Sequence, residues 1–291
     1  MVTGASGVVG RAVVKALLAT DEVRATVRRP EAAESLRELG AKVTVRAGSS
    51  ADELAEVLPR CHTLVHLIGG VAQPDPAAMF AANHESVLVA IEAARAAGTA
   101  RIIFLSVPGA DPEHTHPFLR AKGMAEVALA DSGLEYAILR CTHAYGLGGL
   151  WFTATVHGAL SAPPFVCGPG SQELAPVHAD DVAAVVAAID DRATPILGTW
   201  GIEGPDVLTA DALVSLLRDD EAPATHAGGQ AAAAALTTLL GAPVDALTAS
   251  FFAMPSRSDA TDAAEAFGVH RVGLIEGLRS TIAASAAIES G

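Results

Sequence analysis

The chain has few of the residues that several classes of protein require. Only three of its 291 residues are cysteines, none of them in a CxxC spacing, and three thiols cannot all pair with one another. They therefore fit a reducing cytoplasm, with the thiols buried. No apolar run approaches the roughly 18 residues that a membrane span needs. The first residues also lack the basic start and the apolar stretch of a signal peptide.

Basic residues are scarce as well. Nineteen Lys and Arg stand against 33 Asp and Glu, which gives a formal net charge of −14. A nucleic-acid or anionic-membrane partner requires a basic face, so neither is expected. Apolar residues make up 51% of the chain, enough for a substantial core. We therefore expect a soluble, acidic, cytoplasmic protein, monomeric or homodimeric, that acts on a small molecule.

Short β-branched runs alternate with longer segments rich in Ala, Leu and Glu, the pattern of βα units in a parallel sheet. The expected strands are Val23–Val27, Lys42–Val45, Thr63–Leu67, Arg101–Leu105, Glu135–Leu139 and Ile196–Ile202. The expected helices between them are Gly10–Ala19, Glu31–Leu39, Asp52–Leu58, Ala77–Ala97, Phe118–Asp131 and Asp180–Asp190. The apolar run Ile102–Leu105 suits a sheet covered on both faces. The pattern predicts an α/β fold with a doubly wound parallel sheet.

This regular pattern ends near Gly146. Residues 146–170 are rich in Gly and Pro, which predicts loops that line a pocket. Beyond Gly204 no strand alternation is visible, and helical pieces are expected instead. The sequence therefore predicts a nucleotide-binding domain over residues 1–204 and a smaller, mostly helical substrate lobe over residues 205–291.

A glycine-rich turn is the most informative motif. Gly4, Gly7 and Gly10 have GxxGxxG spacing and lead directly into an apolar-periodic helix. Glycines permit a tight turn and close approach of the backbone to a pyrophosphate, and the helix N-terminus supplies free N–H groups. Three glycines alone are a weak signal, but this turn opens a βα series of the right length for a Rossmann-type domain.

Other motifs point to the same family. Thr3–Gly10 resembles the opening of extended and atypical short-chain dehydrogenase/reductases, including the NmrA-like group, as do Val27-Arg28-Arg29-Pro30 and Leu64–Gly69. The stretches Ala97–Ser106, Leu139–Gly146, Pro176–Ala183 and Phe267–Arg279 are similar to later motifs of that family, with Cys141 where Pro is usual. The resemblance covers nearly the whole chain and implies an NAD(P)-dependent oxidoreductase.

Two features depart from that family. The first strand is almost absent, because only two residues precede Thr3. The usual catalytic pair is a Tyr and a Lys four residues apart, whereas Phe118 stands at the Tyr position before Lys122. No YxxxK occurs anywhere in the chain, so the usual phenol proton donor is missing.

The second expected strand ends in two arginines. NAD enzymes usually place an acidic residue there to bind the ribose 2′-hydroxyl. This chain has Arg28 and Arg29, whose guanidinium groups fit a 2′-phosphate through charge-assisted hydrogen bonds. The alternative is two solvated loop arginines. We predict NADP(H) as the cofactor.

Three residues are candidates for catalysis. The resemblance implies that Lys122 holds the nicotinamide ribose hydroxyls. Ser106 follows a strand at its carboxyl end, where open α/β sheets bind ligands, although capping of the backbone would also explain it. His116 is a possible substitute proton donor, because imidazole titrates near neutral pH. His114 and His116 have no apparent third ligand, so no metal site is predicted.

The predicted cofactor contacts follow the family motifs. They are Gly4, Ser6, Gly7, Val8, Val9, Gly10, Arg28, Arg29, Ile68, Gly69, Gly70, Ser106, Lys122 and Thr142. The predicted substrate pocket comprises His143, Tyr145, Trp151 and Phe152, although packing over the cofactor loop is equally compatible with these aromatic residues.

These residues favour an NADPH-dependent reductase of a small conjugated or aromatic carbonyl, enone or imine. Two alternatives stay open at this point. One is an NADP(H)-binding sensor or regulator without turnover, which the missing Tyr favours. The other is a cyclase or isomerase on the same fold.

Overall fold

Seven parallel strands form one sheet, in the order β11-β6-β5-β4-β1-β2-β3. The structure is a computed structural model that describes residues 1–46, 50–218, 220 and 223–289. The strands are β1 (Val2–Thr3), β2 (Arg24–Val27), β3 (Lys42–Val45), β4 (Thr63–His66), β5 (Arg101–Ser106), β6 (Glu135–Cys141) and β11 (Leu197–Ile202). The strand order reverses between β1 and β4, and a ligand crevice is expected beside such a switch point.

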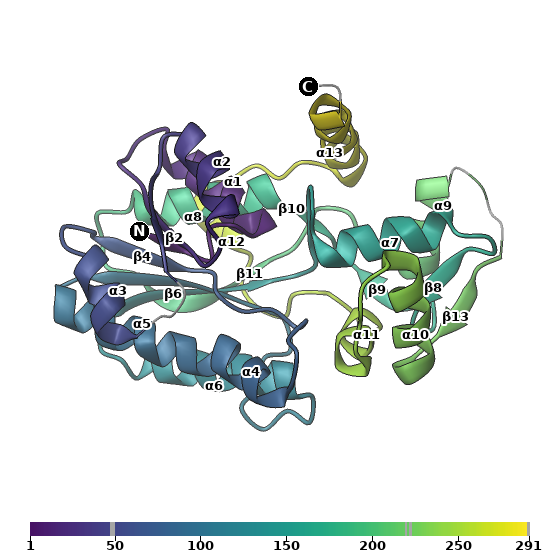
Figure 1. Ribbon diagram of the computed structural model, residues 1–291, viewed down its shortest axis with the longest axis horizontal. Coiled ribbons are helices and arrows are strands. Elements are labelled where there is room, and N and C mark those ends of the chain that lie inside the picture. Colours follow the sequence, from purple (N-terminus) through teal and green to yellow (C-terminus); the bar gives the residue numbers. More distant parts are fainter. Residues whose placement is uncertain (47–49, 219, 221–222, 290–291) are drawn as a thin grey trace. The chain divides into compact units, whose positions relative to one another are not determined.

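Helices cover both faces of this sheet (Figure 1). On one face α1 (Val8–Leu17) packs on α8 (Ala179–Asp190), and on the other α5 (Ser86–Ala97) packs on α3 (Ala51–Val57) and α6 (Pro117–Ala130). Two further helices of this part of the chain are α2 (Glu31–Glu38) and α12 (Ala263–Phe267). The predicted α/β class with a doubly wound parallel sheet is confirmed.

Apolar residues of the central strands and of the helices above them form the core. Ile102 and Phe104 of β5 are completely buried and belong to a cluster that includes Leu64 of β4, Val87 of α5 and Leu129 of α6. Side chains at alternate positions of a strand point to opposite faces. Because both faces are covered, β5 is apolar on both sides, as its sequence indicated.

The helix expected over Ala77–Ala97 is interrupted. The structure has α4 (Pro76–Phe80), then a π-helical turn, η1 (Ala81–Glu85), and then α5. The fully buried Asn83 lies in this turn, and its amide nitrogen donates hydrogen bonds to the carbonyls of Gly70 and Met79. A π turn adds a residue to the helix, and such turns are frequent at functional sites.

The chain divides into two compact units, which differ from the predicted domains. Unit 1 comprises Met1–Cys141, Ala179–Ile202 and Ser258–Arg271, and unit 2 comprises Thr142–His178, Glu203–Arg257 and Val272–Gly291. The predicted boundary at residue 204 is therefore corrected. Residues 146–170 belong to unit 2, and a segment beyond residue 204 returns to unit 1.

Unit 2 is mostly helical, with short strand pairs. Its helices are α7 (Leu150–Leu160), α9 (Ala210–Arg218), α10 (Gly229–Leu240), α11 (Ala246–Phe252) and α13 (Leu274–Glu289). Its strands are β7 (Ala144–Tyr145), β8 (Phe165–Cys167), β9 (Glu173–Leu174), β10 (Val177–His178), β12 (Leu208–Thr209) and β13 (Thr225–Ala227). The prediction of pocket loops over residues 146–170 is thus wrong for α7, because the eleven residues between Gly149 and Ser161 form a helix.

No helix within the described ranges combines the length and the apolar character needed to cross a bilayer.

Candidate functional site

The glycine-rich turn joins β1 to α1 as the sequence predicted. Gly4 has a φ of +71°, and a Cβ there would lie 2.7 Å from the Leu67 carbonyl carbon. A Cβ on Gly10 would lie 2.4 Å from the Gly4 oxygen, so the fold itself requires glycine at both positions. A Cβ on Gly7 would meet only the Gly4 oxygen, at an ordinary 3.5 Å. Gly7 therefore leaves open space in front of the helix.

The N-terminus of α1 is arranged to receive an anion. Gly7 is the N-cap residue and offers no side chain, and the first turn holds no acidic residue. Other helices are capped by a side chain, such as Ser50 on α3 and Asp262 on α12. The free N–H groups and the dipole of α1 thus face the space beside Gly7, which suits a phosphate.

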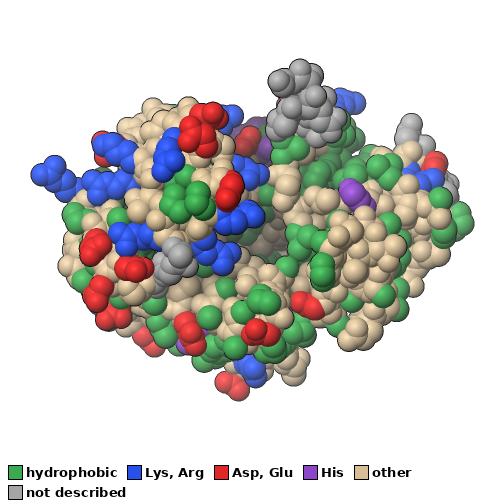
Figure 2. Space-filling view, viewed as in Figure 1, with side chains coloured by type: hydrophobic (Ala, Val, Ile, Leu, Met, Phe, Trp, Pro, Cys, Tyr) green, Lys and Arg blue, Asp and Glu red, His purple; other side chains and the backbone are tan. Residues whose placement is uncertain are grey.

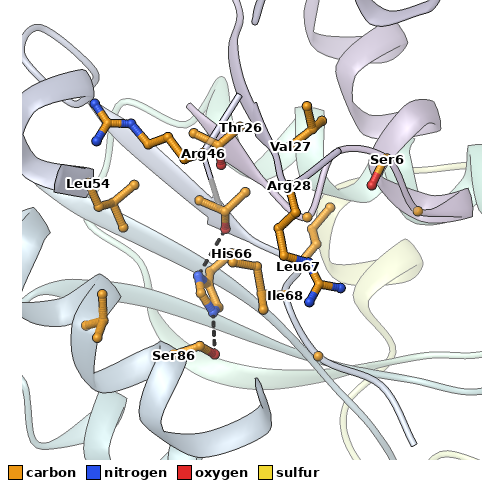
Figure 3. A pocket seen from close by; sticks show the side chains of 15 residues that line it. Ser6, Thr26, Val27, Arg28, Arg46, Leu54, His66, Leu67, Ile68 and Ser86 are labelled. Atoms are coloured by element: carbon orange, nitrogen blue, oxygen red, sulfur yellow. Dashed lines mark hydrogen bonds between the residues drawn. The ribbon is translucent and has the colours of Figure 1, made fainter. Parts of the chain in front are cut away.

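A cavity of about 220 Å³ opens beside this turn (Figure 3). Its lining comes from the turn, from the carboxyl ends of β1, β2, β3 and β4, and from α3 and α5: Thr3, Gly4, Ser6, Gly7, Thr26, Val27, Arg28, Arg46, Leu54, His66, Leu67, Ile68, Gly69, Ser86 and Val89. Gly4, Ser6, Gly7, Arg28, Ile68 and Gly69 are therefore brought together as predicted. Val8, Val9 and Gly10 begin the adjacent helix.

A buried hydrogen-bonded chain lies along one wall of this cavity (Figure 3). The Ser86 hydroxyl donates to the Ala82 carbonyl at 2.7 Å, so it accepts from His66 Nε2 at 3.1 Å. His66 Nδ1 then accepts from the Thr3 hydroxyl at 3.0 Å. Burial, and to a smaller extent the charge of Lys122, lowers the pKa of His66 to about 3. The wall is therefore polar but uncharged.

Arginines surround the turn on its outer side. Arg28 is exposed and lines the cavity of about 220 Å³. Arg29 lines a neighbouring hollow of about 360 Å³ together with Arg11 and Ser6. Arg11 Nη1 also donates to the Ser6 carbonyl at 2.8 Å. Ser6 lines both hollows and Glu31 lines the second one, so an anion beside the Ser6 hydroxyl would lie near several guanidinium groups and one carboxylate.

Lys122 lies on α6 at the carboxyl ends of β4 and β5. Its side chain is buried, and Nζ donates to the Leu105 carbonyl at 2.8 Å. A Cβ built on Gly69 would lie 3.1 Å from Nζ, so the ammonium group adjoins the loop after β4. Asn83 holds that loop by accepting from Gly70 N at 2.9 Å. Burial lowers the pKa of Lys122 to about 8, partly offset by the charge of Glu126.

Ser106 is the last residue of β5 and is buried. Its hydroxyl donates to Glu126 Oε1 at 2.5 Å, and the same carboxylate accepts a hydrogen bond from Arg140 Nη2 at 2.7 Å. The Ser106 proton is thus directed into the protein, which supports the structural explanation of this residue. A catalytic role for Ser106 stays a prediction.

His116 is the N-cap residue of α6 and is buried. Its backbone N–H donates to His114 Nδ1 at 2.8 Å, so the two histidines order the loop before the helix. Within the described part of the chain, no three His, Cys, Asp or Glu side chains gather as a metal site would require. A role for His116 as proton donor stays a prediction.

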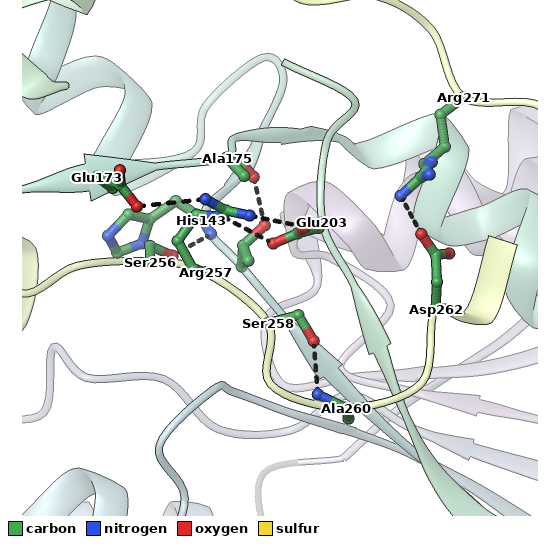
Figure 4. Close-up of polar contacts among 11 residues, drawn as sticks. His143, Glu173, Ala175, Glu203, Ser256, Arg257, Ser258, Ala260, Asp262 and Arg271 are labelled. Carbon is green, nitrogen blue, oxygen red and sulfur yellow. Dashed lines mark hydrogen bonds and ion pairs between the residues drawn. The ribbon is translucent and has the colours of Figure 1, made fainter. Parts of the chain in front are cut away.

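The remaining predicted site residues belong to unit 2. The Thr142 hydroxyl donates to the Ala175 carbonyl at 2.6 Å, and His143 N donates to the Ser256 hydroxyl at 3.0 Å (Figure 4). His143 stacks on Trp151 with ring centroids 4.5 Å apart. The ring of Tyr145 lies 5.7 Å from that of Phe152.

These aromatic side chains contact one another within unit 2. Trp151 also lines a cavity of about 40 Å³, bounded on other sides by Gln172 and Phe252. That volume has room for about one or two water molecules but not for an aromatic substrate. The structure therefore places the four residues in two aromatic pairs, and their assignment to a substrate pocket stays a prediction.

A sequence model of the NAD(P)H-binding family matches residues 4–192, a range that includes most of unit 1 and the first segment of unit 2, Thr142–His178. The chain belongs to this family. The predicted resemblance to extended and atypical short-chain dehydrogenase/reductases is thereby confirmed at the level of family and fold, whereas the NmrA-like subgroup stays a prediction.

The relatives of this chain have names that refer to different activities. The chain is 26% identical over 217 residues to the photosystem II assembly factor Ycf39 of Cyanophora paradoxa, covering 72% of this chain and 66% of that protein. It is 26% identical over 198 residues to a ceramide reductase of Caulobacter vibrioides, covering 68% and 62%. The chain thus spans less than two thirds of the length of these relatives.

A solved structure extends the comparison of folds to almost the whole chain. The NADPH complex of the quinone oxidoreductase QOR2 from Escherichia coli superposes with a TM-score of 0.76 at 22% identity, covering 96% of this chain and 98% of that one. At this identity the likeness establishes the fold.

Several residues that line the cavity beside the glycine-rich turn were not predicted. Arg46 and Leu54 come from the end of β3 and from α3, and Ser86 comes from the start of α5. Only the topology brings these positions together, since no motif links them. His66 did carry a signal, because it is a polar residue within the otherwise apolar run Leu64–Leu67, near the carboxyl end of an expected strand.

Proposed function

We propose that the chain is an NADP(H)-dependent reductase of a small conjugated or aromatic carbonyl, enone or imine, working without the usual tyrosine. The observation that carries the proposal is the position of Lys122, buried beside Gly69 at the same edge of the sheet as the open turn at Gly7. The same edge of the sheet thus carries both a turn that suits a dinucleotide and a buried cation at the carboxyl ends of the strands.

The residues present fit the dinucleotide. The uncapped N-terminus of α1 and the open space at Gly7 suit a pyrophosphate, and Leu54 and Val89 offer apolar walls to a base. The dinucleotide, when bound, supplies hydride. Lys122 Nζ holds the ribose end by hydrogen bonds and keeps a positive charge where negative charge develops on the substrate.

Arg28 and Arg29, with Arg11, support the phosphorylated form of the cofactor. Guanidinium groups bind phosphate oxygens through paired hydrogen bonds. Ser6 lines the hollows of both Arg28 and Arg29 and adds a hydroxyl donor. No acidic residue stands at the end of β2, where an NAD enzyme would bind the ribose 2′-hydroxyl.

Cofactor preference tests this part of the proposal. We expect NADPH to bind at least about tenfold more tightly than NADH, which is about 1.4 kcal/mol. Substituting both Arg28→Ala and Arg29→Ala should abolish most of the difference, since the hydrogen bonds to the 2′-phosphate are lost. Arg37→Ala is the matched control, because Arg37 is a half-exposed residue of α2 paired with Glu34 at 3.7 Å. Fluorescence titrations measure the affinities, and equal affinity in the parent protein would contradict the proposal.

One observation favours a second function, an NADP(H)-binding sensor without turnover. Phe118 stands where the family usually has its phenol, and it is buried on α6 one helical turn before Lys122. Incubation with NADPH and a panel of enones, quinones and imines separates the two functions. Loss of the reduced nicotinamide absorbance supports a reductase, whereas tight binding without loss across the panel supports a sensor.

A further inference from the structure

Two side-chain hydrogen bonds, one residue apart, join α6 to the end of β5. Lys122 Nζ donates to the Leu105 carbonyl at 2.8 Å, and the Ser106 hydroxyl donates to Glu126 at 2.5 Å. Lys122 and Glu126 are four residues apart on α6 and therefore share one face, with Cβ atoms about 5–6 Å apart. The exposed fractions of the two residues are only 5% and 8%, so little water separates them.

Glu126 is itself held in place from a neighbouring strand. Arg140 of β6 binds its carboxylate side-on, with Nη2 to Oε2 at 2.7 Å and Nε to Oε1 at 3.1 Å. Arg140 Nη2 also donates to the Ala110 carbonyl at 3.1 Å. A guanidinium bound side-on forms two charge-assisted hydrogen bonds with a carboxylate. Glu126 is thus buried and fixed in position.

The groups that face Lys122 come from four elements. Among the described residues the charged or titratable ones are Glu126 on its own helix and His66 on β4. From β5 the ring of Phe104 lies 4.6 Å from Nζ, and the loop held by Asn83 of η1 passes beside it. His66 is neutral at physiological pH, since its pKa is about 3. Glu126 is therefore the anion on which the charge of Lys122 depends.

We infer that Glu126 is a positioning residue for Lys122: fixed by Arg140 and Ser106, it holds the ammonium group charged and in register with Leu105. The inference rests on the proposed function for what Lys122 does to a cofactor, but the placement of Glu126 four residues from Lys122 on the same buried face of α6 does not depend on a cofactor. Burial alone favours loss of the ammonium proton, and a nearby anion opposes that loss. An amide at position 126 keeps the shape but removes the charge.

The protonation of Lys122 can be observed directly, because the chain has only three lysines, Lys15, Lys42 and Lys122. Protein labelled with 13C at the lysine Cε is titrated between about pH 6 and 11 by NMR, spanning the ordinary lysine pKa. Signals are assigned with Lys15→Arg and Lys42→Arg. We expect Glu126→Gln to raise the acid dissociation constant of Lys122 about tenfold, that is, to lower its pKa by about one unit.

Two variants complete the design. Arg140→Met leaves the carboxylate of Glu126 without its guanidinium, so it should shift the Lys122 titration in the opposite direction, to higher pH. Asp259→Asn is the matched control: Asp259 is exposed and touches Arg140 Nη1 at 3.6 Å, and its substitution should leave Lys122 unchanged. If Glu126→Gln does not fold, the substitution is combined with Arg140→Met, which removes both charges of the pair. A lower pKa of Lys122 in the double variant than in Arg140→Met alone supports the inference, and equal pKa values overturn it.

The outcomes are distinguishable from those of the proposed function. An unchanged Lys122 titration in folded Glu126→Gln, or a shift in Asp259→Asn as large as in Arg140→Met, would overturn the inference. Since these titrations use the protein without cofactor, a failure to bind NADPH would count against the proposed function alone. Where NADPH does bind, its affinity should decline at a lower pH in Glu126→Gln than in the parent.

Discussion

At the scale of single residues, the three glycines of the first turn differ in what each one serves. Gly4 and Gly10 have backbone atoms within 3 Å of where a Cβ would lie, whereas Gly7 does not. The first two glycines are thus required by the polypeptide itself. Gly7 has an ordinary φ of −70°, so the backbone does not require glycine there, and the proposed pyrophosphate gives a reason for the missing side chain.

Gly7→Val therefore separates folding from binding. The branched side chain would occupy the space where the backbone approaches a pyrophosphate, so we expect dinucleotide binding to be lost. The unfolding midpoint should change little, because the new Cβ meets no close neighbour. Gly10→Ala is the contrasting variant and should destabilise the fold, since its Cβ would overlap the Gly4 oxygen. Calorimetric titration with NADPH, beside thermal unfolding, measures both effects, and normal NADPH binding by Gly7→Val would place the cofactor elsewhere.

Lys122 and Phe118 make a second pair of predictions at this scale. Lys122→Ala should weaken NADPH binding modestly and lower turnover by a larger factor, about 10²–10⁴ where general acid assistance is lost. An unchanged rate would remove Lys122 from the chemistry.

Phe118→Tyr would restore the usual pair, with the charge of Lys122 favouring the phenolate and so lowering the phenol pKa. It should raise the rate for carbonyl substrates, because hydride transfer leaves an alkoxide that needs a proton. For enones reduced at carbon the change should be neutral or harmful. Steady-state rates on both substrate classes, compared with the parent, provide the measurement, and equal effects on the two classes would contradict this account.

At the scale of elements, a buried arginine fixes the end of α8 against the sheet. Arg101 is 1% exposed and donates to the carbonyls of Ile189 and Asp190 at the helix C-terminus. It also binds the Glu135 carboxylate on β6 and reaches the carbonyls of Arg192 and Thr194 before β11. A single guanidinium therefore satisfies backbone groups that the helix leaves without partners.

Arg101→Met should destabilise the protein by about 3–5 kcal/mol, because the partly buried Glu135 carboxylate and several carbonyls lose their buried donor. Arg37→Met is the matched control, since its half-exposed pair with Glu34 contributes at most about 1 kcal/mol. Urea unfolding of both variants gives the comparison. A loss below about 1 kcal/mol for Arg101→Met would show that water replaces the guanidinium.

The elements also show where sequence reasoning succeeds. The predicted strands agree with the structure to within a residue or two, because β-branched runs between helices have few alternatives in a covered sheet. The π turn at η1 was not predicted, since the stretch Ala77–Ala97 has helical periodicity throughout and the extra residue depends on Asn83 reaching Gly70. Helix α7 was missed because the glycines before it and the prolines after it dominated the composition of residues 146–170.

At the candidate site, local motifs predicted the turn and Lys122, but they could not predict contacts between segments that are distant in the sequence. No motif in the sequence distinguishes Glu126 from other helix residues, because its partners Arg140 and Ser106 lie on two separate strands. The division into units depends in the same way on residues 258–271 returning to the sheet, which no local pattern signals.

At the scale of the whole molecule, charge is unevenly distributed. Residues 1–46 contain eight basic and five acidic residues, whereas the rest of the chain has eleven basic and 28 acidic ones. Basic side chains gather over the corresponding part of unit 1 (Figure 2). The cavity beside the glycine-rich turn thus lies in the positive part of an acidic protein.

This distribution predicts the salt dependence of cofactor association. A dinucleotide is attracted by the local field and repelled by the net charge of −14. The local field should dominate, because a Debye length of about 10 Å at 0.1 M salt screens the distant acids more than the nearby arginines. Stopped-flow measurements should therefore show an association rate for NADPH that falls as salt rises. A rate that increases with salt would show that net charge governs the encounter.

Unit 1 consists of three separate segments of the chain, so the order in which the chain is synthesised determines when this unit can finish folding. Its third segment, Ser258–Arg271, places the Thr261 carbonyl 2.8 Å from Gly201 N and packs α12 on α8. A nascent chain therefore cannot complete this unit until residues up to Arg271 have left the ribosome. All seven strands exist well before that, and β11 and α8 lack their last neighbours in the interval. A fragment cut at residue 204 would be held in that same state, which makes the site of truncation decisive for anyone seeking the cofactor-binding unit alone.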